Sequence, residues 1–107
     1  MECMRQLLHP ELTTVAVTDV LRALADPIRL DIVRQLFFSQ DALTCSQLDQ
    51  GRAKSSMSHH YKVLRDAGVI RTHIAGKEHF NLLRRTELDT RFPGLLASIV
   101  HDSAQSQ

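Results

Sequence analysis

Cysteine is scarce in this sequence, and this scarcity indicates the redox state of the compartment in which the chain works. Its two cysteines, Cys3 and Cys45, lie far apart and form no CxxC pair. A small secreted scaffold stapled by disulfides would carry more cysteines at closer spacing. The cysteines therefore predict a chain of the reducing cytoplasm. A Gly-rich phosphate loop is also missing, and we expect no cofactor.

Long apolar runs and a strong net charge are also missing. No run of about 18 apolar residues is present, so we expect neither a membrane span nor a signal peptide. The net charge is only +1, which excludes a polycationic nucleic-acid binder, so basic character must come from local placement of charge. With 43% apolar residues among 107, the chain should form one small core that gains from a partner.

Internal repeats and low-complexity blocks are absent as well. Near the start, His9-Pro10 argues against a helix running through it, and the last residues are small and polar. We therefore predict a flexible N-terminal segment at residues 1–13, one domain at residues 14–102 and a frayed tail at residues 103–107.

The most informative stretch is KSSMSHHYKVLRDAG, residues 54–68. Read as a helix, it places Met57, Tyr61 and Leu64 on one apolar stripe, at i, i+4 and i+7. Hydroxyls, imidazoles and basic side chains lie on the other side, and no acidic residue appears before Asp66. Such a helix suits the major groove of DNA, with an ordinary surface helix as the plain alternative.

Helical signals precede this stretch. An apolar stripe predicts a first helix over residues 14–25, and Asp26-Pro27 favours the start of a second. Thr44, with Gln47 three residues on, resembles a capping box that opens a short third helix. A turn at residues 51–53 then leads into residues 54–68, which together predict a helix-turn-helix.

After residue 68 the apolar period changes from helical to alternating. Residues 69–74 and 78–83 are expected to form a β-hairpin around a three-residue loop at residues 75–77. This register places Ile70 opposite Leu82 and Thr72 opposite Phe80 on the inward face. We reject a one-residue slip because it would divide the apolar residues between both faces.

A last helix is predicted over about residues 93–101, more apolar than a lone terminal helix needs. The fold class is therefore mainly α with a small β-hairpin, a winged helix-turn-helix.

The order of these elements resembles the ArsR family of winged-helix repressors. The likeness is carried by LADPIRLDIVRQL (residues 24–36), SMSHHYKVLRDAGVI (residues 56–70) and the wing GKEHFNL (residues 76–82). The resemblance implies a homodimeric bacterial transcription factor on an inverted-repeat operator, released from DNA by a metal ion, metabolite or oxidant. It also implies helical dimerisation ends, which predicts these interface residues: Val17, Leu21, Leu24, Leu95, Leu96, Ile99 and Val100.

Two features depart from the family pattern. The turn after residue 48 lacks the usual apolar-Gly-apolar element. Cys45 stands between Thr44 and Ser46, where arsenic and cadmium sensors of the family carry a CxC pair, so a soft-metal site lacks its thiolates. We expect Cys45 to pack as a small hydrophobe, with a thiol pair to Cys3 of another subunit as the alternative. We predict no metal site.

The expected DNA contacts lie on the helix at residues 54–66 and on the wing. Short side chains near the helix N-terminus should read bases, and the lysines should meet phosphates; the resemblance adds Ser58 and His60. The predicted set is Lys54, Ser55, Ser56, Ser58, His59, His60, Lys62, Arg71 and Lys77.

Two other functions compete with this interpretation. A Ser/His enzyme is excluded because no orienting carboxylate or oxyanion loop accompanies the serines. A winged-helix module that binds protein is the alternative, but positive charge gathered in residues 52–77 favours double-stranded DNA. We predict a sequence-specific DNA-binding regulator, an effector-released repressor, whose other partners are a second copy and a small-molecule or other effector.

Overall fold

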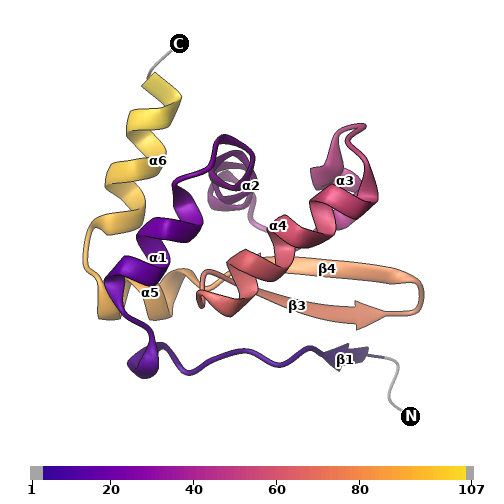
Figure 1. Ribbon diagram of the computed structural model, residues 1–107, viewed down its shortest axis with the longest axis horizontal. Helices are drawn as coiled ribbons and strands as arrows, with labels where there is room; N and C mark the ends of the chain where they lie inside the picture. Colours follow the sequence, from indigo (N-terminus) through magenta and orange to yellow (C-terminus); the bar gives the residue numbers. More distant parts are fainter. Residues whose placement is uncertain (1–3, 106–107) are drawn as a thin grey trace.

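The computed structural model describes residues 4–105 of the chain, with side chains for residues 7–101 (Figure 1). Cys3 lies outside the described residues. The elements in chain order are β1 (Met4–Gln6), the 3-10 helix η1 (Leu12–Thr14), α1 (Val17–Leu24), α2 (Pro27–Phe38), β2 (Leu43–Thr44), α3 (Cys45–Asp49), α4 (Lys54–Asp66), β3 (Ile70–Ala75), β4 (Glu78–Leu83), α5 (Arg85–Arg91) and α6 (Leu95–Gln105). Within the described residues, none of these helices combines the length and the apolar character that a membrane crossing requires.

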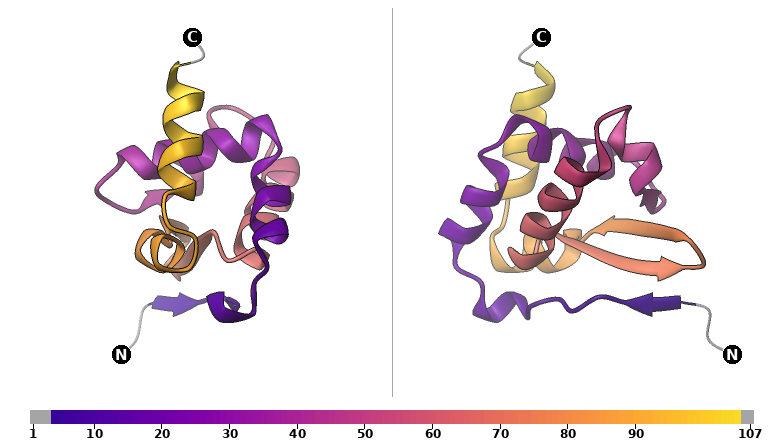
Figure 2. Two further views of the ribbon diagram at one scale, coloured as in Figure 1. Left: turned by 90° about the vertical axis from the view of Figure 1, so that its left-hand side faces the viewer. Right: turned by 45° about the vertical axis from the view of Figure 1, so that its right-hand side comes forward.

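The helices divide between two ends of the molecule. Helices α1, α5 and α6 lie at one end, whereas α3 and α4 lie above the hairpin of β3 and β4 at the other (Figures 1 and 2). The antiparallel sheet has the strand order β1-β3-β4-β2, so β1 covers the outer edge of the hairpin. This arrangement confirms the predicted winged helix-turn-helix.

Two predicted helix starts are confirmed in atomic detail. The carboxylate of Asp26 accepts hydrogen bonds from the backbone N–H groups of Ile28 and Arg29, both at 3.0 Å. At α3, Thr44 Oγ1 accepts from the N–H of Gln47 at 3.1 Å, and Gln47 Oε1 accepts from the N–H of Thr44 at 2.8 Å. These side chains satisfy backbone donors that the first turn of each helix leaves free.

The predicted hairpin register is wrong by one residue. Strands β3 and β4 pair with Thr72 opposite Asn81 and His73 opposite Phe80, around a two-residue turn of Gly76 and Lys77. Gly76 has a φ of +63°, and glycine in the first position of a two-residue turn is typical of the type II′ hairpin.

A buried polar pair accounts for this register. Thr72 and Asn81 are both fully buried, and Thr72 Oγ1 donates to Asn81 Oδ1 at 2.7 Å. Asn81 Nδ2 donates in turn to the carbonyl of Leu43 in β2 at 3.2 Å. Apolar matching alone does not identify this register, because the inward face includes polar groups that satisfy one another's hydrogen bonds.

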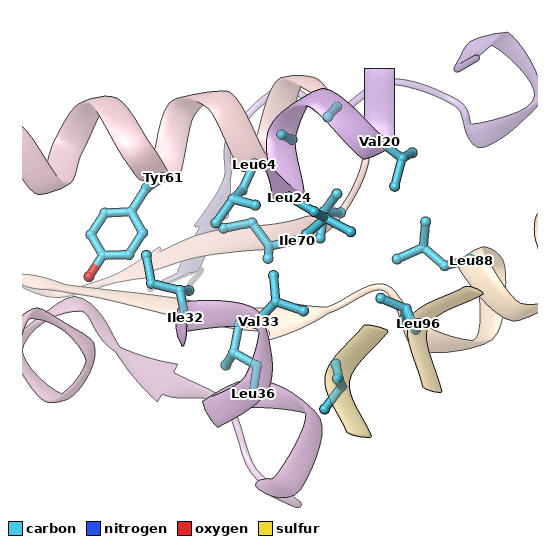
Figure 3. Close-up of a cluster of buried hydrophobic side chains, with 14 of the residues drawn as sticks. Val20, Leu24, Ile32, Val33, Leu36, Tyr61, Leu64, Ile70, Leu88 and Leu96 are labelled. Atoms are coloured by element: carbon cyan, nitrogen blue, oxygen red, sulfur yellow. The ribbon is translucent and has the colours of Figure 1, made fainter. Parts of the chain in front are cut away.

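The core lies between the helices and one face of the sheet (Figure 3). Helix α4 contributes Met57, Tyr61 and Leu64, so the stripe predicted from the sequence is confirmed as its buried face. Opposite it, α2 contributes Ile32 and Val33, both without exposed surface. Burial of each such side chain stabilises the fold by about 1.5–3 kcal/mol.

The core also takes up part of the predicted dimer interface. Leu24, Leu96 and Val100 are buried within the single chain, which corrects their assignment to contacts between subunits. Of the remaining interface residues, Leu95 and Ile99 are half-buried on α6, whereas Val17 and Leu21 of α1 are 40% and 42% exposed. Helix α6 extends to Gln105, so the predicted tail begins later than residue 103.

The N-terminal segment is likewise corrected, because the predicted boundary at residue 13 cuts through the fold. Strand β1 pairs antiparallel with β3, with Met4 opposite Ala75 and Gln6 opposite His73. Further along, Leu12 is buried in the core. We call residues 4–12 the N-terminal arm.

Packing of the arm depends on Gly68, at the junction between α4 and β3. Gly68 has a φ of +78°, and an added Cβ would lie 2.5 Å from Leu12 Cδ2. We expect Gly68→Ala to lower the free energy of unfolding by more than the about 1–2 kcal/mol of the left-handed backbone alone. The control is Gly94→Ala, at a φ of +80° with nothing within 4 Å of an added Cβ, which should show the backbone cost only. Equal losses in urea unfolding would contradict this account of the arm.

Candidate DNA interface

The outer face of α4 is polar, basic and exposed. Ser55, His59 and Lys62 recur at i, i+4 and i+7 on the side opposite the buried stripe, and all three are exposed. Lys54 and Ser58 flank them on the side of the hairpin, and both are also exposed. The first two turns of the helix therefore present hydroxyl, imidazole and ammonium groups to solvent, with no carboxylate among them.

Helix α3 is held against α4 by a buried hydrogen bond. Tyr61 OH donates to Asp49 Oδ1 at 2.5 Å, and Leu48 of α3 is fully buried beside this contact. Burial and the neighbouring Asp49 carboxylate raise the pKa of Tyr61, so the phenol stays protonated and remains a donor. The hydrogen bond and the burial of Leu48 thus connect α3 to α4 and to the core in a turn that has no apolar-Gly-apolar element.

A groove of about 330 Å³ separates α3 and α4 from the tip of the wing. Lys54 and Arg65 line it from α4, Lys77 and His79 line it from the wing, and Leu7 lines it from the arm. Basic side chains from two elements thus line one concave surface next to the exposed face of α4, together with the carboxylates of Asp49 and Glu78.

Comparisons with known proteins agree with this geometry. The helix-turn-helix domain family matches residues 24–73, which run from the end of α1 into β3. The chain is 32% identical over 82 residues to YceK, an uncharacterized HTH-type transcriptional regulator of Bacillus subtilis (strain 168), and the match covers 75% of this chain and 82% of YceK. The chain belongs to the HTH-type transcriptional regulators.

A solved structure supports the same assignment. The transcriptional repressor BigR from Xylella fastidiosa superimposes with a TM-score of 0.58 at 27% identity, over 71% of this chain and 85% of BigR. The matched proteins are transcriptional regulators and not enzymes, and the protein is a DNA-binding regulator of the winged helix-turn-helix type.

The structure corrects the prediction that His60 contacts DNA. Its side chain is only 14% exposed, with Nδ1 3.2 Å from Arg29 Nη1 and 3.8 Å from Asp26 Oδ2. Although desolvation opposes it, hydrogen bonds from the N–H groups of Arg29 and Ile28 lower the pKa of Asp26, which stays ionised. His60 therefore fastens α4 to the start of α2 and does not face outward.

Arg71, another predicted DNA contact, forms an ion pair within the chain. Its Nη2 lies 3.3 Å from Glu87 Oε1, and the same carboxylate pairs with Arg84 Nε at 2.8 Å. The hydrogen bond from Arg84 lowers the pKa of Glu87 and keeps it ionised. Lys62 pairs with Asp66 at 2.7 Å, but both side chains are exposed, and such a pair contributes only about 0.3–0.5 kcal/mol, so Lys62 can exchange its partner for a phosphate.

Arg65 also belongs to the basic groups of this surface. It lies within the basic stretch at residues 52–77 but is missing from the predicted DNA contacts, although it follows Lys54, Ser58 and Tyr61 along one side of α4, at spacings of four, three and four residues. That spacing is the signal that could have placed Arg65 beside the wing.

Cys45 is half-buried and lines the groove, and its Sγ accepts a hydrogen bond from Asn81 Nδ2 at 3.4 Å. Burial raises the pKa of the Cys45 thiol, which disfavours the reactive thiolate. In the part of the chain that the structure describes, no three His, Cys, Asp or Glu side chains come together to hold a metal ion.

Proposed function

We propose that this regulator is an ArsR-type repressor of the cytoplasm, which binds an inverted-repeat operator as a homodimer and is released by an effector. The observation that carries the proposal is the exposed basic face of α4 beside Lys77 at the tip of the wing. The ArsR-like sequence of residues 24–36 and 56–70 and the likeness to the repressor BigR support the finer assignment.

In the proposed complex, the N-terminal half of α4 enters the major groove. Ser55, Ser58 and His59 are short enough to reach base edges from an exposed helix, whereas Lys62 lies nearer the phosphates. Lys77 meets the backbone of a flanking region, because the two-residue turn ends the wing at that point. Base contacts then give sequence preference, and lysine contacts give salt-dependent affinity.

The proposed dimer uses α1 and α6, which lie on the same end of the molecule (Figure 2). Val17 and Leu21 are the exposed apolar side chains of α1, and Leu95 and Ile99 offer half-buried surface on α6. This end lies away from α3 and the wing tip, so a second copy bound here leaves both α4 helices free for DNA.

Binding to a protein instead of DNA is the competing function. An exposed apolar patch on α4 would favour it, but the apolar side chains in the first two turns of α4 are buried. The polar outer face is better matched to base edges and phosphates.

Loss of a base contact and loss of a phosphate contact should change DNA binding in different ways. We expect His59→Ala to weaken operator binding by about 1–3 kcal/mol and to relax the preference at one position of each half-site. Lys77→Ala should weaken operator and scrambled duplexes alike. Because each subunit of the dimer would then leave one phosphate unneutralised, the slope of log affinity against log salt should flatten by about 0.9 per subunit. Fluorescence anisotropy in a salt series measures both effects.

The matched control for the removal of positive charge is Arg22→Ala on α1, an exposed position at the opposite end of the molecule. Because α1 carries the proposed dimer contacts, light scattering first checks that this variant associates like the wild type. The variant should leave affinity and salt slope at their wild-type values. If His59→Ala and Lys77→Ala also bind DNA like the wild type, α4 and the wing do not face DNA. The competing function, binding to a protein, would then be the better explanation.

The dimer interface is tested without DNA. Leu21→Glu places a charge on the proposed apolar contact, where it would be desolvated without a partner, so we expect the dimer to dissociate while the helical content stays unchanged. Light scattering at micromolar concentration with circular dichroism measures both properties. The control is Leu8→Glu, an arm position that is 95% exposed, which should remain dimeric. A monomeric wild type would contradict the proposal.

A further inference from the structure

The N-terminal arm lies along the wing and is fastened there by a histidine side chain. The N–H of Leu7 donates to the carbonyl of Thr72 at 3.2 Å, which continues the ladder between β1 and β3 by one residue. The N–H of Thr72 donates at 2.9 Å, but its acceptor is His9 Nε2. An imidazole thus takes the place of the main-chain acceptor that would close the ladder.

This replacement follows from the course of the chain. In an antiparallel pair, Leu7 opposite Thr72 would exchange two backbone hydrogen bonds with it. After Leu7 the arm turns away toward Pro10, whose carbonyl accepts from Arg84 Nη1 at 2.8 Å. The His9 side chain reaches back from this departing segment and satisfies the buried N–H of Thr72.

Only a neutral imidazole can make this contact. Nε2 accepts through its lone pair, and protonation converts it into a donor that faces the donor N–H of Thr72. The ionisable groups around His9 are Arg71 of β3, Arg84 before α5, Arg65 of α4 and Glu87 of α5. Three of these four are cations, so a charged imidazole is unfavourable at this place.

We propose that His9 is a proton-operated latch: when it is neutral it holds residues 4–8 against the wing, and when it is protonated it releases them. Desolvation, followed by the charges of Arg71, Arg84 and Arg65, lowers the pKa of His9 from its ordinary value of 6.5. The latch is therefore closed at neutral pH and opens as the pH falls through the pKa of the folded state, below 6.5.

Only the part of the arm before Pro10 is released. Beyond that residue the arm keeps anchors that do not depend on His9, because Arg84 holds the carbonyl of Pro10 and Leu12 is buried against Gly68. The core is therefore unaffected when the latch opens. Leu7 lines the groove between α4 and the wing, so release removes one wall of that groove.

The test is hydrogen exchange followed by NMR on the full chain without DNA, between about pH 7.5 and about pH 5. Protection factors, corrected for the intrinsic exchange rate at each pH, should fall about tenfold at Leu7 and Thr72, as expected when one hydrogen bond is broken. The midpoint should coincide with the titration of the His9 imidazole, while amides of the core helices stay protected.

Two variants separate a latch from general acid sensitivity. His9→Gln keeps an amide oxygen that accepts at every pH, so the transition should disappear. His9→Ala should leave Leu7 and Thr72 weakly protected throughout. The control is His101→Gln, which removes an exposed histidine of α6 and should leave the transition unchanged.

Three results would overturn the proposal: a transition that persists in His9→Gln, full protection of Thr72 in His9→Ala at about pH 7.5, or constant protection in the wild type while His9 titrates. Each is read from the protein alone, so none depends on the proposed DNA-binding mode.

Discussion

The structure depends above all on the one-sided burial of α4. Met57, Tyr61 and Leu64 fill the centre of a small core, and this fixes the rotation of the helix about its own axis. Because a helix turns through a full circle every 3.6 residues, the same burial directs Ser55 and His59 toward solvent. Core packing and presentation of the proposed DNA-reading face are therefore a single constraint, and a change of register in α4 would disrupt both.

The wing is positioned by a second constraint of a different kind. The buried hydrogen bond between Thr72 and Asn81 selects one register of the hairpin, and that register places Lys77 at the tip. The same Thr72 meets the N-terminal arm through its backbone groups, by way of Leu7 and His9. One residue thus connects the inner face of the wing with the strand that covers its edge.

Local signals in the sequence predicted much of this molecule. The cap at Asp26, the capping box at Thr44 and the buried stripe of α4 depend on neighbouring residues, and all three are confirmed. The hairpin register was missed because polar pairing outweighs apolar matching at Thr72. His60, the terminal apolar residues and the arm are misassigned from the sequence because their partners lie far away along the chain, as Arg29 does from His60 and Thr72 from His9. Tertiary contacts decide such cases, and sequence periodicity does not contain them.

The central claim is that two copies of α4 read one symmetric DNA site. The most direct measurement is to select binding fragments from a random-sequence DNA library with the full-length wild type and to sequence them. The account predicts enrichment of an inverted repeat whose half-sites are centred about 10–10.5 base pairs, or a multiple of that spacing, apart. Fragments with no shared sequence, or with a single asymmetric site, would contradict it.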